Sequence, residues 1–567
     1  VRLFAMVKFF KFLTGAAMKE AFVAQRLKID GIVQGVGFRP FVYHLGNHYQ
    51  LKGQVLNISS GVSLHIEGTR KDIESFSRDL IGKCPPRALI TAISKRAAPV
   101  RNLKNFTIAK SRTHKSVSTL IPPDVSICDD CLRELFDPRD RRYQYPFINC
   151  TNCGPRYTIV KNIPYDRHDT AMAKFRMCEK CQAEYDDPEN RRFHAQPTAC
   201  ADCGPRVTLY DNSGTLIATA DPIGEGVNLL KQGALIALKG LGGFHLVADA
   251  ENSETLQKLR KRKLRKEKPL AMMSAHIEAI RNYAHVDKEE EVLLSSPQRP
   301  IVFLRKKIPN CISEYVSPEN RYFGVMLPYT PLHYLVFQSG FTALVMTSGN
   351  ISEEPMAIGN DEAFERLSGI ADFFLCHNRD IIVPSDDSIA RPLAGRTRLI
   401  RRARGYAPAP IFLNGKVPRI LACGADMKNT ICLTHKDKAF LSQHIGDLDN
   451  FDTYEYYCST IDQLKQIFCI EPEIIAFDLH PDYLSTRFAE NHKDLQKIQV
   501  QHHHAHIASC MAENRLDEKV IGISFDGTGY GTDEAIWGGE ILLADLKGFE
   551  RAGSLSYVPM PGSTHRP

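Results

Sequence analysis

Two stretches with the same cysteine spacing stand in the first half of the chain: "CDDCLRELFDPRDRRYQYPFINCTNC" at residues 128–153 and "CEKCQAEYDDPENRRFHAQPTACADC" at residues 178–203. Each copy has two Cys-x2-Cys pairs separated by eighteen residues, and each continues into Cys-Gly-Pro-Arg. A two-residue gap lets both thiolates of a pair reach one tetrahedral zinc ion, at about 2.3 Å from each sulfur. The repeat therefore predicts tandem zinc ribbons.

A disulfide framework is the alternative, because eight of the sixteen cysteines lie in these two copies. Such frameworks are typical of short secreted domains, whereas this chain has 567 residues and no clear signal for secretion. We therefore expect two structural Zn²⁺ ions. Their ligands would be Cys128, Cys131, Cys150, Cys153, Cys178, Cys181, Cys200 and Cys203.

The pairing of the cysteine pairs stays open at this point. Cys128 and Cys131 could share an ion with the second pair of their own copy or, in an interleaved fold, with Cys200 and Cys203. We expect the sequential pairing. Four thiolates fill the zinc shell, so these ions would be structural and the chemistry would lie elsewhere. Since few large apolar residues separate the pairs, residues 113–212 are expected to bury little core and to need metal for folding.

Length and composition indicate an ordinary multidomain protein. At roughly 150 residues per domain, 567 residues suggest about four domains, with 43% hydrophobic and 24% charged residues. No apolar run has the length of a membrane span, and Lys8 and Lys11 interrupt the apolar start, so we expect a cytoplasmic protein without a membrane part. The net charge of +7 allows anionic substrates without requiring nucleic acid.

The stretch "GIVQGVGFR" (31–39) places a glycine-rich turn between an expected strand at 24–30 and a helix, and two further strands flank Asn57. Backbone N–H groups of such a turn can surround a phosphate, which the planar guanidinium of Arg39 would also bind. A simple hairpin turn is the alternative. The motif with Asn57 resembles acylphosphatase over residues 22–112, which implies a ferredoxin-like domain in which Arg39 binds the phosphoryl group and Asn57 holds the attacking water.

A run rich in lysine and arginine follows an expected strand, turn and strand at 233–250. Charge runs are usually solvated helix faces. Here the run at 258–268 has little acidic compensation and ends in Lys268-Pro269, which favours a bound polyanion such as nucleotide phosphates or RNA. Further on, in "VMTSGNISEEP" (345–355), an expected strand is followed by a turn rich in hydroxyl and amide side chains.

These motifs together resemble the YrdC family over about residues 215–405. The resemblance implies a basic groove that binds ATP with Mg²⁺ and transfers an acyl-like group onto AMP. It assigns Lys263, Arg265 and Lys268 to the phosphates. It assigns the nucleotide or substrate to Thr347, Ser348, Asn350 and Ser352.

The stretch "QHHHAHIASCMAE" (501–513) places His502 and His506 four residues apart, on one face of a helix, as two imidazoles sharing a metal require. Purely structural histidines are the alternative. Asp526, in "FDGTGYG" (525–531), is the expected third ligand, on a strand that enters a glycine turn suited to phosphates. The sequence thus predicts an open site for a further metal ion, Zn or Fe.

The order of these motifs resembles the HypF family of carbamoyltransferases, which mature nickel-iron hydrogenases. The resemblance implies a multidomain fold of α/β and α+β classes, and it gives the following domains: an N-terminal extension (1–21), an acylphosphatase-like domain (22–112), tandem zinc ribbons (113–212), a YrdC-like α/β domain (213–405) and a partial actin-like (ASKHA) domain (406–567). It implies that carbamoyl phosphate is hydrolysed, that carbamate and ATP form carbamoyl adenylate, and that the carbamoyl group passes to the C-terminal cysteine of HypE.

Family members carry a second lobe of the last domain beyond the point where this sequence stops. We therefore expect adenylate formation but poor transfer to HypE. One rival interpretation is an RNA-binding protein that binds tRNA, because YrdC relatives act in tRNA threonylcarbamoylation. Such a protein has no need of the acylphosphatase motif. A truncated, inactive relative is the other.

Overall fold

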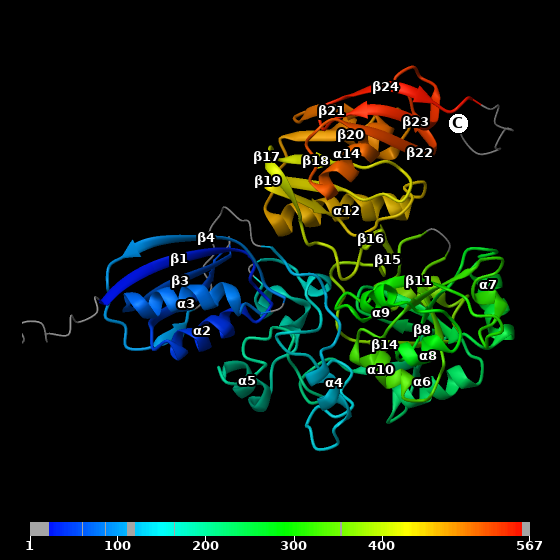
Figure 1. Ribbon diagram of the computed structural model, residues 1–567. Helices are drawn as coiled ribbons and strands as arrows, with labels where there is room; N and C mark the ends of the chain where they lie inside the picture. The colour runs from blue at the N-terminus through cyan, green and yellow to red at the C-terminus, as the bar shows by residue number, and fades with distance from the viewer. Residues whose placement is uncertain are drawn as a thin grey trace, which may run out of the picture. The chain divides into compact units, whose positions relative to one another are not determined.

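The computed structural model describes residues 22–58, 61–85, 87–109, 120–163, 165–351 and 354–557 (Figure 1). The chain divides into two units, one with residues up to 120 and 183–195, the other with 121–182 and 196–567. The expected N-terminal extension and Ser352 lie outside the described residues. Within the described ranges, no helix has both the length and the apolar composition needed to cross a membrane.

The first sheet has five strands in the order β4-β1-β3-β2-β5, and α2 and α3 pack on it through one apolar cluster (Figure 1). Its elements are β1 (Phe22–Ile32), α2 (Phe38–His48), β2 (Lys52–Ile58), β3 (Gly61–Thr69), α3 (Arg70–Gly82), β4 (Leu89–Ala98) and β5 (Phe106–Ile108). All neighbouring pairs are antiparallel except β2 and β5. The expected order of strand, helix, strand, strand is confirmed, but Asn57 lies within β2 rather than between two strands.

A buried carboxylate ties the segment after β4 to this sheet. Glu67 on β3 accepts hydrogen bonds from the backbone N–H groups of Arg101 (2.7 Å) and Leu103 (3.1 Å), and its Oε1 lies 2.8 Å from His65 Nε2. Burial alone would raise the pKa of Glu67, but these hydrogen bonds outweigh burial and hold its pKa below the usual value. The carboxylate therefore stays charged and fixes the chain between β4 and β5.

The zinc segment consists of short helices joined by loops: α4 (Asp129–Phe136), η1 (Tyr157–Ile159), η2 (Arg167–Asp169), η3 (Ala171–Lys174) and α5 (Glu179–Asp186). Tyr145, Phe147, Ile148 and Met172 are buried in one apolar cluster together with the cysteines of the first copy. The expectation that this segment buries little core is therefore wrong. The aromatic residues between the cysteine pairs, and others between the copies, pack around the metal site.

The largest sheet has eleven strands in the order β16-β15-β11-β12-β10-β13-β9-β8-β14-β6-β7. Its strands are β6 (Val207–Asp211), β7 (Leu216–Ile217), β8 (Ile236–Lys239), β9 (Phe244–Asp249), β10 (Ala271–Met273), β11 (Ile301–Arg305), β12 (Tyr322–Met326), β13 (Leu344–Ser348), β14 (Phe373–His377), β15 (Ile389–Leu393) and β16 (Arg396–Arg401). Because β6 starts at Val207, this sheet begins within the stretch assigned above to the zinc segment. The domain boundaries given above stay predictions.

Both faces of this sheet are apolar, because neighbouring residues of a strand point to opposite faces. Val345 belongs to the apolar cluster on one face, while Leu344 and Met346 belong to the cluster on the other. Helices from both sides contribute to these clusters. The helices are α6 (Pro222–Lys231), α7 (Ser253–Arg262), α8 (Ile277–Arg281), α9 (Lys288–Ser295), η4 (Glu314–Val316), α10 (Pro331–Phe337) and α11 (Asn360–Leu367).

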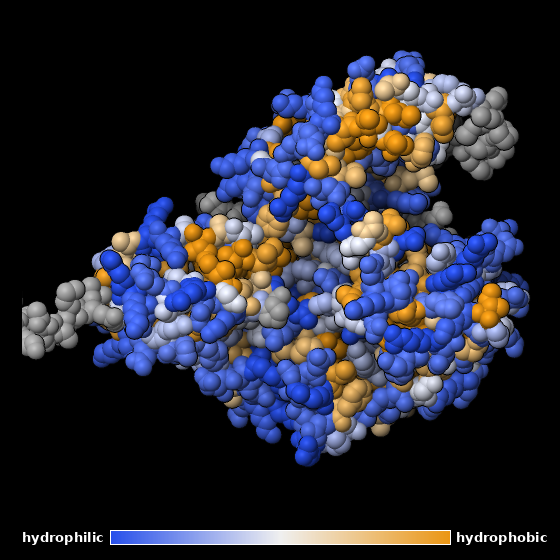
Figure 2. Space-filling view, in the orientation of Figure 1, coloured by the Kyte–Doolittle hydropathy of each residue, from blue (hydrophilic) through white to orange (hydrophobic). Residues whose placement is uncertain are grey.

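The last part of the chain holds a five-stranded sheet, β17-β19-β18-β20-β21, and a three-stranded sheet, β22-β23-β24. Its elements are β17 (Ile411–Val417), β18 (Ile420–Ala422), β19 (Cys432–Leu441), α12 (Phe451–Phe468), β20 (Ile474–Asp478), α13 (Leu484–Asn491), β21 (Gln496–Val500), α14 (His502–Asn514), β22 (Val520–Tyr530), β23 (Ile536–Ala544) and β24 (Phe549–Ser554). One face of the smaller sheet packs on α14 through Ile507, Met511 and Leu542. Figure 2 shows apolar side chains on its other face, where Ile521, Ile523 and Phe525 are exposed.

We predict that Glu67→Gln loosens the first sheet locally. A neutral amide has one acceptor oxygen fewer for Arg101, Leu103 and His65, and losing a buried hydrogen bond to a charged group costs about 1–3 kcal/mol. Native-state hydrogen exchange should show less protection of the β3 and β4 amides by about this amount.

Glu74→Gln is the matched control, since Glu74 is an exposed residue of α3 in the same domain. Equal protection in the Glu67 variant and this control would show that the buried carboxylate does not hold the segment.

Candidate functional site

The glycine-rich turn after β1 has the backbone that an anion site requires. Gly35 and Gly37 have φ of 68° and 73°, in the left-handed region that glycine enters without strain. Gly37 is the N-cap of α2, whose first turn carries the buried Arg39. Gln34 Nε2 donates to the carbonyls of Ile58 (2.9 Å) and Gly61 (2.8 Å), which ties this turn to the β2 end that carries Asn57.

Asn57 is fully buried, yet neither Nδ2 nor Oδ1 of its amide has a hydrogen-bond partner among the described residues. An unsatisfied buried amide is costly, and in native proteins it usually marks a place for water or a ligand. The structure therefore places an amide without hydrogen-bond partners among the described residues, that of Asn57, near the end of β2, beside the glycine turn that leads to Arg39.

The eight ribbon cysteines form two groups, and in each group four ligand atoms lie within 4.8 Å of one another. In the first group, sulfur separations are 3.6 Å for Cys128–Cys150, 3.9 Å for Cys150–Cys153 and 3.5 Å for Cys131–Cys153. In the second, the equivalent separations are 3.7, 3.8 and 3.6 Å.

A tetrahedron with 2.3 Å bonds has sulfur separations of about 3.8 Å, so both groups fit a zinc ion, whereas a disulfide needs about 2.05 Å. Each group contains the four cysteines of one copy, which agrees with the sequential pairing and not with the interleaved one.

Two arginines of the first copy contact the second cluster. Arg141 Nη2 lies 3.1 Å and Arg142 Nη2 3.6 Å from Cys181 Sγ, and Arg142 Nε donates to the carbonyl of Ala199 at 2.8 Å. Four thiolates around one Zn²⁺ carry a net charge of about −2, which nearby guanidinium groups stabilise. The link across the two copies was not visible in the cysteine spacing.

The residues expected at the nucleotide site come together in the second unit. Lys263 is buried, and its Nζ donates to the carbonyls of Ser348 (2.7 Å) and Asn350 (2.5 Å) and to Asn350 Oδ1 (2.7 Å). Arg265 Nη1 donates to Thr347 Oγ1 at 3.1 Å, while Lys268 is exposed. Burial lowers the pKa of Lys263 to about 7 and that of Arg265 to about 10.

The lysine- and arginine-rich run is partly neutralised by a distant acid. Asp372 pairs with Lys258 (2.7 Å) and Arg262 (2.8 Å), and Arg260 donates to several backbone carbonyls, among them that of Tyr315. The expectation of little acidic compensation is therefore wrong for these residues. Asp372 follows them by more than a hundred positions, so the local sequence could not reveal the pairing.

The expected metal ligands of the last domain also meet. His502, His506 and Asp526 have ligand atoms within 4.8 Å of one another, and Asp526 Oδ2 lies 2.8 Å from His502 Nε2 and 3.4 Å from His506 Nε2. His502 Nδ1 lies 2.7 Å from Asp478 Oδ2, an aspartate at the end of β20 that was not among the predicted site residues. A carboxylate behind a ligating imidazole fixes its tautomer and orientation, so this donor set fits a metal ion.

Two details of this region differ from expectation. The stretch 525–531 is not a glycine turn, because β22 continues to Tyr530 with a register shift between Phe525 and Gly529. Asp526 therefore sits on a bulged strand, which re-aims its side chain. The other two histidines contact backbone: His503 Nε2 lies 3.3 Å from the carbonyl of Gly538, and His504 Nε2 lies 2.8 Å from that of Asp545.

Comparison with known proteins gives this arrangement its context. Carbamoyltransferase HypF2 of Cupriavidus necator is 46% identical over 561 residues, which are 95% of this chain and 69% of the relative. The chain belongs to the HypF carbamoyltransferase family. Carbamoyltransferase HypF of Synechocystis is likewise 46% identical, over 94% of this chain and 71% of its own.

Solved HypF structures agree with the fold. A crystal structure of full-length HypF in a phosphate- and nucleotide-bound form is 51% identical, with a TM-score of 0.91 over 94% of this chain and 70% of that one. The crystal structure of T. kodakarensis HypF is 44% identical, with a TM-score of 0.90 over 95% of this chain and 70% of that one.

Family profiles match most of the chain between residues 25 and 566. They are described as acylphosphatase (25–108), HypF finger (127–160 and 177–210), telomere recombination (228–403), HypF Kae1-like domain (415–513) and carbamoyltransferase, Kae1-like domain, second subdomain (522–566). The predicted fold class is confirmed. As a HypF-family member, the protein is an enzyme with carbamoyl-transfer and acylphosphatase activities, and its two cysteine clusters are structural zinc sites.

We predict that Arg142→Met weakens zinc binding at the second cluster only. Methionine cannot stabilise the negative charge of the cluster as the guanidinium next to Cys181 does. Loss of a group that contacts a metal ligand typically lowers metal affinity by about 10–100-fold. In a chelator titration, one of the two zinc ions should leave at a chelator concentration lower by at least about tenfold.

Arg139→Met is the control, because Arg139 is an exposed neighbour that pairs with Asp137. Two zinc ions held as firmly in the Arg142 variant as in this control would contradict the interpretation.

Proposed function

We propose that this HypF-family enzyme hydrolyses carbamoyl phosphate, joins the released carbamate to ATP as carbamoyl adenylate, and passes the carbamoyl group to the C-terminal cysteine thiol of HypE. The observation that carries the proposal is the unmet buried amide of Asn57 beside the turn that bears Arg39. The similar HypF structure in a phosphate- and nucleotide-bound form supports it. A cytoplasmic location suits the ribbon cysteines, which need to stay reduced to hold zinc.

In the first step, water attacks the phosphorus of carbamoyl phosphate and the bond from phosphorus to the bridging oxygen breaks. Carbamate leaves with the bonding electrons, and one dihydrogen phosphate forms for each water consumed. Arg39 and the N–H groups of the glycine turn would stabilise the phosphoryl oxygens, and the Asn57 amide would hold the water in line.

In the second step, a carbamate oxygen attacks the α-phosphorus of ATP and pyrophosphate leaves. Arg265 and the exposed Lys268 are the groups whose charge would stabilise the phosphates, and Mg²⁺ would enter with ATP. Lys263 acts as a positioning residue, because its ammonium group holds the backbone of the turn that carries Ser348 and Asn350. Thr347 and that turn would contact the nucleotide.

In the third step, the HypE thiolate attacks the carbamoyl carbon and AMP leaves. We propose that His502, His506 and Asp526 hold a Zn or Fe ion, which would supply Lewis-acid stabilisation of negative charge when bound. Asp478 would fix His502 in the orientation that presents Nε2 to the metal.

An RNA-binding function loses its main support in the structure. Lys258, Arg260 and Arg262 are engaged with Asp372 and backbone carbonyls, so a large part of the basic run is not offered to a polyanion. Nucleic acid is therefore not proposed as a partner.

We predict that Arg39→Gln lowers phosphate release from carbamoyl phosphate by at least about 100-fold, and Asn57→Ala by about 10–100-fold, since each removes a preorganised contact to the reacting group. Phosphate release is measured with the full chain. Arg26→Gln, on the exposed side of β1, is the control and should keep wild-type activity.

In the same variants, pyrophosphate exchange into ATP should depend on carbamoyl phosphate in wild type and fall with phosphate release in Arg39→Gln. Exchange that is equally fast without carbamoyl phosphate would contradict the proposed order of steps.

We predict that Asp478→Asn weakens metal binding at His502, His506 and Asp526 by about 10–100-fold, because an amide orients the imidazole less well than a carboxylate. The measurement is titration of the metal into the zinc-loaded full chain. Asp482→Asn, four residues further on and exposed, should bind metal as wild type does. Identical affinities for both variants would remove Asp478 from the site.

A further inference from the structure

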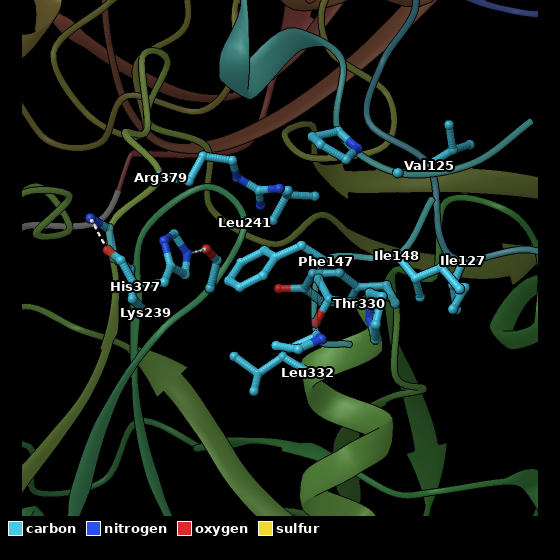
Figure 3. A pocket seen from close by; sticks show the side chains of 16 residues that line it. Val125, Ile127, Phe147, Ile148, Lys239, Leu241, Thr330, Leu332, His377 and Arg379 are labelled. Atoms are coloured by element: carbon cyan, nitrogen blue, oxygen red, sulfur yellow. Dashed lines mark hydrogen bonds between the residues drawn. The ribbon is translucent and has the colours of Figure 1, made fainter. Parts of the chain in front are cut away.

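A small cavity lies where the zinc segment meets the eleven-stranded sheet (Figure 3). Its volume is about 30 Å³. Phe147 and Ile148 line it from the zinc segment, and Leu241 and Leu332 from the sheet domain. A space of this size holds about two water molecules or one small planar ion, and it excludes a nucleotide.

Arg379, which follows β14, reaches over this cavity toward Phe147 (Figure 3). It is only 6% exposed, and its guanidinium carbon lies 5.1 Å from the centre of the Phe147 ring. Within the described part of the chain, no hydrogen bond or ion pair reaches this guanidinium, whereas both neighbours in sequence are engaged: Asn378 accepts from Arg206 N–H, and Asp380 pairs with Lys174. With no protein acceptor among the described residues, the N–H donors of this guanidinium need water or a bound anion as partner.

Lys239 adds a second buried cation to the cavity wall. It is 4% exposed, and its Nζ donates to Asn360 Oδ1 at 2.7 Å and to the His377 carbonyl at 3.3 Å, both of them uncharged acceptors. Burial lowers the pKa of Lys239 to about 8 and that of His377 well below its usual value. The His377 ring is therefore neutral, and its Nε2 lies 3.1 Å from the carbonyl of Gly240.

Two carboxylates lie near the cavity, and neither forms an ion pair with Arg379 or Lys239 among the described residues, although Asp124 Oδ2 is buried without a hydrogen-bond partner and its charge acts on Arg379. Asp124 Oδ1 accepts from the N–H groups of Arg156 (2.7 Å) and Thr158 (3.3 Å) and from Thr158 Oγ1 (2.9 Å), and burial raises the pKa of Asp124. Asp380 is half exposed in its pair with Lys174. The cavity thus has two buried cations, apolar walls and no carboxylate ion-paired with either cation among the described residues.

We infer that this cavity binds one planar oxyanion of the carboxylate type, carbamate or bicarbonate, through the guanidinium of Arg379 and the positive charge of Lys239. The planar guanidinium of arginine can donate two parallel hydrogen bonds to two carboxylate oxygens. A lysine beside it adds positive charge and does not need those two positions. The inference rests on the proposed function, in which carbamate is released at one place and consumed at another.

The position of the cavity suits a holding site next to the candidate nucleotide site. Lys239 ends β8, which pairs with β9, and β9 pairs in turn with β13, where Ser348 lies opposite His245. Two strand spacings amount to about 10 Å. The backbone of Lys239 in the cavity wall therefore lies about 10 Å from that of Ser348 in the turn at 347–350.

The arginine of this donor set suits carbamate. Carbamate breaks down when its nitrogen takes up a proton: the bond from carbon to nitrogen breaks, its electron pair goes to nitrogen, and ammonia and carbon dioxide form. Arg379 can donate hydrogen bonds while keeping its protons, since burial lowers its pKa only to about 10. The apolar walls offer few groups that could hydrogen-bond water beside the ion.

The test uses the full, zinc-loaded chain and ¹³C-labelled bicarbonate, with binding followed by NMR. Potassium bicarbonate and ammonium bicarbonate form the two arms, since only the second generates carbamate. Arg379→Met removes the fork while keeping apolar volume over Phe147, and Arg379→Lys keeps the charge alone. Lys174→Met is the matched control, because it removes an exposed cation that pairs with Asp380.

We expect wild type and the control to bind the anion equally, Arg379→Met to bind at least about tenfold more weakly, and Arg379→Lys to fall between them. With carbamoyl phosphate and ATP, Arg379→Met should release phosphate at the wild-type rate but form at least about tenfold less pyrophosphate per phosphate. Tighter binding in the ammonium arm would identify carbamate as the preferred ion.

No saturable binding of either anion to wild type would show that the cavity holds only water, and the inference would be overturned. Equal binding by wild type and Arg379→Met would overturn it as well. Anion binding in a wild-type chain that forms no pyrophosphate would refute the proposed function and leave the site standing. If Arg379→Met loses zinc, Lys239→Met, which leaves the guanidinium over Phe147 in place, decides by the same two measurements.

Discussion

Tetrahedral coordination of zinc by four thiolates is the constraint on which the middle of this protein depends. Within each copy the sulfurs lie 3.5–3.9 Å apart, and only short helices and loops connect them. Such a chain has little regular backbone hydrogen bonding, so metal binding and the shared apolar core together stabilise it. Once the first cluster is closed, the residues between its cysteine pairs are brought together, and Tyr145, Phe147 and Ile148 pack into a shared core. The wall that Phe147 gives the Arg379 cavity therefore depends on metal coordination nearby.

Patterns contained in a short stretch of sequence were predicted well. The cysteine spacing predicted both clusters, and the sequential grouping, which the spacing left open and we expected, agrees with the structure. The spacing of His502 and His506 placed both on one face of α14, since four residues make about one helical turn. Asp526, expected as a third ligand because it precedes a glycine-rich stretch, lies beside both histidines.

Contacts between distant segments were missed. Asp372 pairs with residues of the basic run at 258–268, more than a hundred positions earlier, and no local sequence pattern predicts that pairing. Asp478 was not among the predicted site residues, because the meeting of β20 and α14 depends on the packing of the whole domain. The glycines of "DGTGYG" suggested a turn, yet pairing with β23 keeps this stretch in a bulged strand, so tertiary context overrode local preference. Arg379 was not predicted as a site residue, since its interest lies in a buried position without an ion-paired acid among the described residues.

The contact of Arg142 with Cys181 bears on how the ribbon duplication evolved. Two copies that arise by duplication start out equivalent, and either could be lost without harm to the other. Here the first copy supplies the cation that stabilises the metal charge of the second. The second ribbon has therefore come to depend on the first, and the two are no longer interchangeable units.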